Sequence, residues 1–186
     1  MNTILEALLS RRSVKPKHLT QPVPDFETLK LAARAALRAP DHGALVPFRF
    51  ILIREEDRAH LADLFEASAI RLGYDDEKVQ RTRSKALKGP MLVAFVTRID
   101  PHHRIPAVEQ ELTAGAAIAQ FLLAIDALGF GAITLSGSIL EDPELQSAFC
   151  LDANESLAGW FTIGTPDENT QKLPETREAP ISVWQP

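Results

Sequence analysis

Hydrophobic residues recur at helical spacing in several parts of the chain. The first pattern lies within the first ten residues. The second starts after Asp25, which can cap a helix, and stops before Pro40, which cannot continue one. Two further patterns each have a glycine just past their end, as helices commonly do. With a short segment nearer the C-terminus, they predict helices over residues 55–72, 76–88 and 142–149.

Runs of β-branched and aromatic residues between these helices predict four strands, over residues 47–54, 90–98, 131–137 and 157–166. The second run is apolar almost throughout, which is typical of a central strand covered on both faces. Helices and strands do not alternate regularly, and no G-x-G-x-x-G follows the first strand, so a doubly wound parallel sheet is not expected. We therefore predict a single domain, residues 1–186, with a three-layer α+β fold in which helices flank a mixed or antiparallel sheet.

The longest helical pattern, residues 107–128, is apolar on nearly every side in its second half. Such a helix has to be enclosed by protein, either in a large core or in a subunit interface. The pattern includes Gln120 and Asp126 and ends on a glycine, so it falls short of the roughly 20 apolar residues that a bilayer requires. We predict a buried helix and no membrane span.

Charge and composition exclude some functions. The net charge of −5 argues against a general nucleic-acid binder, which needs a basic surface. A single cysteine and the lack of a cleavable apolar leader predict a reducing, cytoplasmic location. The last twenty residues, 167–186, are polar and proline-rich. They are either a disordered tail or an extended arm that packs Val183 and Trp184 on a neighbour.

Three groups of side chains superficially suggest catalytic or metal sites but lack the necessary spacing. Cys150 ends an apolar segment with no adjacent cation that would favour a thiolate, and Ser136 and Ser138 stand outside any G-x-S-x-G motif. No H-x-x-x-H or H-E-x-x-H pair occurs among the potential metal ligands, which are Asp41, His42, His102, His103, Glu109 and Glu111. We predict neither a metal site nor a side-chain nucleophile.

A basic cluster follows the first helix: Arg11, Arg12, Ser13 and Lys15. On one interpretation, the arginines only complement the negative C-terminal end of that helix. On the other, two guanidinium groups and a hydroxyl bind a phosphate, and Lys15 reaches a second anionic centre. The residues by themselves leave both interpretations open.

Three segments resemble, in order and separation, those of the flavin-dependent nitroreductases. "SRRSVK" resembles the R-x-S-x-K segment near the start of that family, and "RAALRAPDHGALVPFRFILI" is similar to its second motif. "EQELTAGAAIAQFLLAIDALGFGAITLSG" is similar to its long central helix, glycine turn and flavin-contacting strand. The resemblance covers almost the whole chain and is strongest to the minimal, single-domain subgroup of the YdjA type.

The resemblance implies an intertwined homodimer that holds two FMN molecules in its interface. Arg11, Arg12 and Ser13 would bind the FMN phosphate and ribityl chain, and Lys15 would approach the pyrimidine edge of the flavin. The helix over 107–128 would form the dimer core. The remaining cofactor-binding residues are implied to be Arg38 and His42, from the other subunit, and Thr134, Leu135 and Ser136 on the strand beside the flavin. Lys172 and Arg177 are further candidates for contact with the phosphate.

The resemblance also implies an activity. NADH or NADPH would reduce the flavin and leave, and a nitroaromatic, quinone or similar electron-poor acceptor would then take its place. No side chain has to act as a nucleophile in such a two-step exchange, so the protein positions the reactants and tunes their electrostatics. The alternatives are a flavin-binding storage or sensor protein without efficient turnover, and a regulatory domain that binds another phosphate ligand or none.

Overall fold

A five-stranded antiparallel sheet forms the centre of the protein in the computed structural model, which describes residues 3–150, 152–170 and 178–185. All strand pairs in these residues are antiparallel, so the antiparallel form of the two predicted sheet types is the one present. Strand β5 pairs with β3 along one edge and with β4 and the two-residue β1 along the other, and β2 follows β3. The strands are β1 (Leu19–Thr20), β2 (Phe48–Ile53), β3 (Met91–Arg98), β4 (Gly131–Leu135) and β5 (Glu155–Pro166).

Strand β3 lies between β2 and β5, and its residues 92–96 are buried. The prediction of a central strand covered on both faces is therefore confirmed. Because side chains alternate along a strand, Val93 and Phe95 point to one face of the sheet and Leu92, Ala94 and Val96 to the other. Each set joins a separate hydrophobic core.

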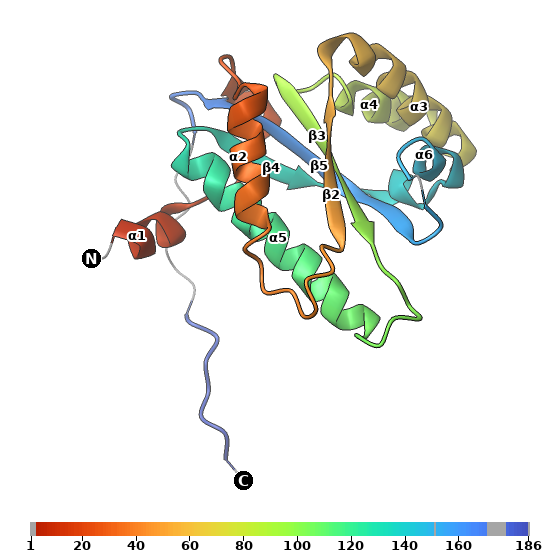
Figure 1. Cartoon of the computed structure of the whole chain (residues 1–186). Coiled ribbons are helices and arrows are strands. Elements are labelled where there is room, and N and C mark those ends of the chain that lie inside the picture. The colour runs from red at the N-terminus through yellow and green to blue at the C-terminus, as the bar shows by residue number, and fades with distance from the viewer. Residues whose placement is uncertain (1–2, 151, 171–177, 186) are drawn as a thin grey trace.

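Six α-helices surround the sheet within the described residues (Figure 1). They are α1 (Thr3–Ser10), α2 (Phe26–Ala36), α3 (Arg58–Arg71), α4 (Asp76–Lys85), α5 (Ala107–Ala127) and α6 (Pro143–Ser147). Asp25 caps α2 as predicted, because its side chain accepts a hydrogen bond from the Thr28 amide at 2.8 Å. The helix predicted over 55–72 begins three residues later, since residues 55–57 form a separate 3₁₀ turn.

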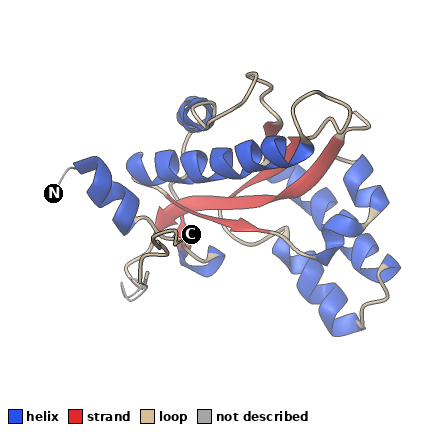
Figure 2. Cartoon of the chain, turned by 90° about the horizontal axis from the view of Figure 1, so that it is seen from below, coloured by secondary structure: helices blue, strands red, loops and turns tan. Residues whose placement is uncertain are grey.

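The helices form two layers, one on each face of the sheet (Figure 2). Helices α2 and α5 cover one face, with Phe121 and Ile125 of α5 packed against Phe161 of β5. Helices α3 and α6 contribute Phe65 and Leu145 to the core on the opposite face, which also contains Trp160. The predicted three-layer arrangement is thus present.

The outer face of α5 is not enclosed by the residues that the structure describes. Val108 and Leu112 are 59% and 68% exposed, and α1, which packs near α5, has no buried residue. The sequence predicted that either a large core or a subunit interface encloses this helix, and the core accounts for only one of its faces.

Residues 178–185 contain no helix or strand, and Ile181, Val183 and Trp184 are exposed. No helix in the described part of the chain has the length and apolarity of a bilayer span.

Two arginines and a buried glutamate join the ends of β2, β3 and β5. Glu155 has a fully buried side chain and accepts hydrogen bonds from Arg49 Nε at 2.8 Å and Arg98 Nη2 at 2.9 Å. Arg49 also donates to the Phe149 carbonyl at 2.6 Å. These bonds compensate for burial of the carboxylate and fix the start of β5.

Candidate functional site

The segment that carries the basic cluster lies beside β4. The Arg11 amide donates to the Ala7 carbonyl at 3.0 Å, which closes α1, and the Val14 amide donates to the Ala132 carbonyl at 3.0 Å. Gly131 allows this approach, because a Cβ at that position would lie only 3.0 Å from Cγ2 of Val14. Two of the groups predicted from the sequence, 11–15 and 134–136, are therefore on adjacent segments.

Two side-chain polar atoms in these segments are buried without a hydrogen-bond partner: Nε of Arg12 and Oγ1 of Thr134. No other such atoms occur among the residues that the structure describes. Buried polar groups in proteins are nearly always hydrogen-bonded, so each of these atoms calls for a partner from outside the chain. Their donor and hydroxyl chemistry fits an anionic, oxygen-rich ligand such as the phosphate and ribityl chain of FMN.

The charges of the cluster are also unpaired. Within the described part of the chain, the side chains of Arg11, Arg12 and Lys15 have no hydrogen bond or ion pair. If the arginines served only the C-terminal end of α1, their guanidinium groups should donate to its last carbonyls. That hydrogen bonding is not observed in these residues, and the geometry favours ligand binding over the helix-dipole interpretation.

Arg38 and His42 lie elsewhere. Both are exposed and belong to the connection between α2 and β2, where Nδ1 of His42 is 2.8 Å from Oε2 of Glu109 at the start of α5. Strand β4 begins beyond the other end of α5, roughly 27 Å further along the helix axis. One chain therefore does not bring His42 to the point where Val14 meets β4. Lys172 and Arg177 lie outside the described residues.

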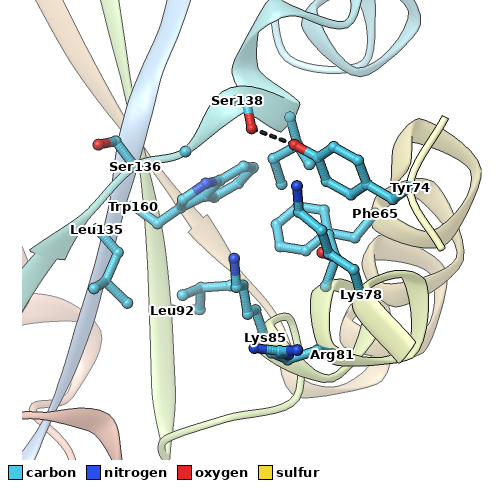
Figure 3. Close-up of a pocket in the computed structure, with 13 residues that line it drawn as sticks. Phe65, Tyr74, Lys78, Arg81, Lys85, Leu92, Leu135, Ser136, Ser138 and Trp160 are labelled. Carbon is cyan, nitrogen blue, oxygen red and sulfur yellow. Dashed lines mark hydrogen bonds between the residues drawn. The ribbon is translucent and has the colours of Figure 1, made fainter. Parts of the chain in front are cut away.

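A cavity of about 240 Å³ adjoins the end of β4 (Figure 3). Leu135, Ser136 and Gly137 form one side of it, and Phe65 and Trp160 contribute aromatic walls. The opposite side comes from α3, α4 and their connection, with residues Tyr74, Lys78, Arg81, Thr82 and Lys85. The cavity thus connects residues implied by the resemblance with residues that the sequence interpretation missed.

The missed residues carry a signal in the sequence. Lys78, Arg81 and Lys85 stand at positions i, i+3 and i+7, which places three cations on one face of a helix.

Helix α4 ends at Lys85, earlier than the predicted residue 88, because the buried side chain of Arg58 binds the carbonyls that follow. It donates to the Ala86, Lys88 and Gly89 carbonyls at 2.9, 2.9 and 2.7 Å.

The side chains rejected as nucleophiles remain poor candidates. Burial raises the pKa of the Cys150 thiol, which disfavours the reactive thiolate. The Ser138 hydroxyl contacts the Tyr74 hydroxyl, and no described histidine is hydrogen-bonded to it to act as a base. Among the described residues, no three histidine, cysteine or acidic side chains form a cluster suited to a metal ion.

The three-layer α+β fold, with its unpaired basic cluster beside the sheet, defines the class of protein, and sequence comparison identifies the family. Residues 8–165 match the Nitroreductase family, and the chain belongs to it. It is 35% identical to the Escherichia coli (strain K12) protein named "Putative NAD(P)H nitroreductase YdjA" over 162 residues, which are 87% of each chain. It is also 31% identical to YfhC of Bacillus subtilis (strain 168) over 171 residues, 90% of this chain and 86% of that protein.

Solved structures agree with this family. A nitroreductase-like protein from Bacillus cereus superposes with a TM-score of 0.80 at 21% identity and covers 100% of this chain and 98% of its own. A structure from Desulfovibrio desulfuricans, determined in complex with FMN, has a TM-score of 0.69 at 25% identity and covers 98% and 99% of the two chains. The predicted fold class is confirmed.

Proposed function

We propose that the chain binds FMN, takes electrons from NADH or NADPH, and reduces a nitroaromatic, a quinone or a similar electron-poor acceptor. Its family, the name of its E. coli relative and the FMN complex of its D. desulfuricans relative support this function. The observation that carries the FMN assignment is the pair of buried, unpartnered atoms, Nε of Arg12 and Oγ1 of Thr134. They lie on two segments that one backbone hydrogen bond joins.

Bound FMN would supply the hydride chemistry, with the balance NAD(P)H + H⁺ + ArNO₂ → NAD(P)⁺ + ArNO + H₂O for a nitroaromatic acceptor. The residues of the chain bind and orient. Arg11, Arg12 and Ser13 hold the phosphate and ribityl oxygens by charge-assisted hydrogen bonds. Lys15 would approach the pyrimidine edge, where a cation stabilises the negative charge of the reduced ring. Thr134, Leu135 and Ser136 would lie beside the ring system.

A homodimer would complete the site. The described part of the chain leaves large apolar side chains exposed on α1 and α5 and along α2 to its C-cap, and exposed apolar patches commonly mark protein interfaces. They include Ile4, Leu8, Leu9, Leu31, Leu37, Val108 and Leu112. His42 and β4 lie near opposite ends of α5. In a homodimer, the Arg38 and His42 of a second copy could therefore approach the flavin bound beside β4 of the first. Sedimentation equilibrium checks this proposal, and a monomer at micromolar concentration would contradict it.

The absorption spectrum of the purified protein tests the proposed function. We expect flavin bands, FMN as the cofactor released on denaturation, rapid bleaching by NADH or NADPH under anaerobic conditions, and recovery of colour on addition of a nitroaromatic. Bound FMN that neither nicotinamide reduces would favour the storage or sensor alternative. A colourless protein that does not take up added FMN would refute the assignment.

A further inference from the structure

The turn that follows Val14 is attached to the sheet at both of its ends. The Val14 amide donates to a carbonyl of β4, and the Asp167 amide, just past β5, donates to the His18 carbonyl at 2.9 Å. Between these points, Pro16–His18 form a 3₁₀ turn, which the His18 amide closes on the Lys15 carbonyl at 2.9 Å. Lys15 therefore lies in a turn held by β4 on one side and by the end of β5 on the other.

A side-chain contact reinforces the second attachment. Nδ1 of His18 lies 3.2 Å from Oδ2 of Asp167, although the two residues are 149 positions apart in the chain. The two side chains are only 24% and 25% exposed, so water is partly excluded from the contact. Within the described residues, no other side-chain hydrogen bond or ion pair joins residues 14–18 to the sheet.

Asp167 is itself held in place by the residues that follow it. Its other carboxylate oxygen, Oδ1, accepts from the Asn169 amide at 2.9 Å, and Oγ1 of Thr170 donates to its carbonyl at 2.8 Å. Burial acts to raise the pKa of Asp167, but hydrogen bonds from His18 and the Asn169 amide outweigh it, and the pKa lies below its ordinary value. Asp167 is thus an ionised acceptor at neutral pH, and Nδ1 of His18 carries the hydrogen of their bond.

Lys15 depends on this attachment because its own side chain has no partner among the described residues. Its backbone is extended, at φ −62° and ψ 146°, as is usual before a proline. The ring of Pro16 stiffens the link between Lys15 and His18, so a displacement of His18 is transmitted to Lys15. The interaction of a cation with a developing charge weakens with distance, and the effect of Lys15 on a flavin therefore depends on where the turn lies.

We propose that His18 and Asp167 are positioning residues for Lys15. Their hydrogen bond holds the turn over residues 15–18 against the end of β5 and keeps the Lys15 charge at the pyrimidine edge of bound FMN, although neither side chain touches the cofactor. Loss of the bond lowers the reduction potential of the flavin, because the reduced form is the more negative one. The proposal rests on the proposed function and adds two residues to the control of its flavin.

Substitutions of His18 test the role of the hydrogen bond. His18→Ala removes it, whereas His18→Asn keeps an N–H donor close to the position of Nδ1. In spectroelectrochemistry of the FMN-loaded protein, His18→Ala should lower the ratio of reduced to oxidised flavin at a fixed potential about threefold. His18→Asn should restore the ratio, and His18→Ala should cause no further change in a Lys15→Ala background. His60→Ala, at an exposed histidine of α3, is the control and should have no effect.

Substitutions of Asp167 separate position from charge. If Asp167 acted only through its charge, both Asp167→Ala and Asp167→Asn would raise the potential, because a negative charge is removed from the vicinity of the reduced flavin. We expect Asp167→Ala to lower the potential as His18→Ala does. Asp167→Asn should leave it nearly unchanged, since the amide oxygen still accepts from Nδ1. The double variant His18→Ala with Asp167→Ala should show the fall of one single variant, because both remove the same bond.

Hydrogen exchange of the FMN-free chain measures the attachment without the cofactor. The Asp167 amide, which donates to the carbonyl of residue 18, should exchange about tenfold faster in His18→Ala than in the unsubstituted protein. The amides of β3 should keep their exchange rates, since a local opening at the turn does not reach the centre of the sheet.

The proposal is overturned by unchanged exchange in His18→Ala, by a rise in potential in Asp167→Ala, or by a fall in His18→Ala that persists without Lys15. A loss of FMN affinity of about tenfold or more in His18→Ala would also overturn it, by assigning His18 to the cofactor. Asp167→Ala provides the same test if His18→Ala does not fold. FMN binding with a potential that ignores His18→Ala refutes this proposal alone, whereas a protein that binds no FMN refutes the proposed function as well.

Discussion

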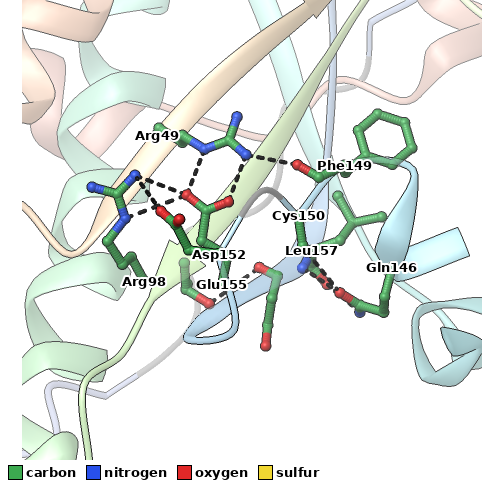
Figure 4. Close-up of polar contacts among 10 residues, drawn as sticks. Arg49, Arg98, Gln146, Phe149, Cys150, Asp152, Glu155 and Leu157 are labelled. Atoms are coloured by element: carbon green, nitrogen blue, oxygen red, sulfur yellow. Dashed lines mark hydrogen bonds and ion pairs between the residues drawn. The ribbon is translucent and has the colours of Figure 1, made fainter.

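Two arginine clusters in this protein have opposite environments. Arg49 and Arg98 surround Glu155, whose side chain is fully buried, and every member of this cluster has a partner (Figure 4). Arg11 and Arg12 have no side-chain partner among the described residues, although Nε of Arg12 is buried. The first cluster has its partners within the chain, whereas the second has none among the described residues, and the proposed FMN would supply them. Whether the arginine side chains have hydrogen-bond or ion-pair partners within the chain therefore distinguishes a structural cluster from a candidate binding cluster.

The largest difference is expected from Arg11→Ala combined with Ser13→Ala. FMN affinity should fall by about 3–6 kcal/mol, because charge-assisted hydrogen bonds contribute roughly 1.5–3 kcal/mol each. The stability of the FMN-free chain should change by less than about 0.5 kcal/mol, as is usual for substitutions that remove no observed contact. Fluorescence titration with FMN measures the affinity, with Arg104→Ala, at an exposed arginine, as the control. Unchanged affinity in the folded double variant would restore the helix-dipole interpretation.

Glu155→Ala should lower the stability of the protein and leave its FMN affinity nearly unchanged. Removing the buried partner of two arginines should lower the free energy of unfolding by about 3–5 kcal/mol. The affinity of the remaining folded molecules for FMN should stay within about twofold. Urea denaturation measures the first quantity. Glu56→Ala, which removes an exposed carboxylate 4.0 Å from Arg54, should change stability by less than about 0.5 kcal/mol. Equal losses in the two variants would show that Glu155 is not a structural centre.

A third paired arginine gives a pH test. The hydrogen bonds from Arg71 to Asp142, at 2.9 and 2.5 Å, lower the pKa of that buried carboxyl below its ordinary value. A carboxyl whose pKa is lower in the folded state stabilises the protein above its unfolded pKa, near 3.9, and loses that contribution as the pH falls through its folded value.

Asp142→Asn should therefore cost roughly 1–3 kcal/mol at pH 7, and the difference from the unsubstituted protein should shrink below about pH 4. Urea midpoints at pH 7, 5 and 3 measure it. A difference that is independent of pH would assign the effect to disturbed capping of α6, where Asp142 accepts from the Leu145 amide and asparagine has only one acceptor oxygen, and not to the charge.

The smallest effect is expected from Lys15→Ala. The reduction potential of bound FMN should fall by on the order of 20–30 mV, about 1 kcal/mol for a two-electron couple, because a cation near the reduced ring is lost. FMN affinity should change by less than about 1 kcal/mol. Spectroelectrochemistry measures the potential, and Lys17→Ala, an exposed lysine two residues further on, is the control. A large loss of affinity with an unchanged potential would move Lys15 to the phosphate.

The sequence was a good guide wherever the determining interactions are local. The apolar run of β3 predicted a strand covered on both faces, and Asp25 predicted the start of α2, because periodicity and capping depend on residues a few positions apart. The two-residue β1 escaped prediction, since its pairing with β5 joins residues about 145 positions apart, as Thr20 and Thr165 illustrate.

The candidate site divides in the same way. The basic cluster and residues 134–136 were identified from motifs, whereas the cationic face of α4 was missed because nothing local indicates that it faces Trp160. The assignment of Arg38 and His42 to the flavin remains a prediction, since the single chain keeps them near the opposite end of α5.

By itself, the sequence determined the six described helices, four of the five described strands, the family resemblance and the position of the basic cluster. Only the tertiary structure decided which charges are compensated. Arg49 and Glu155 are 106 residues apart and meet because β2, β3 and β5 pair, whereas the fold brings no acidic partner to Arg12 within the described residues. Burial and long-range pairing set the free energy required to bury a charged side chain, and neither can be read from the segment that carries the charge.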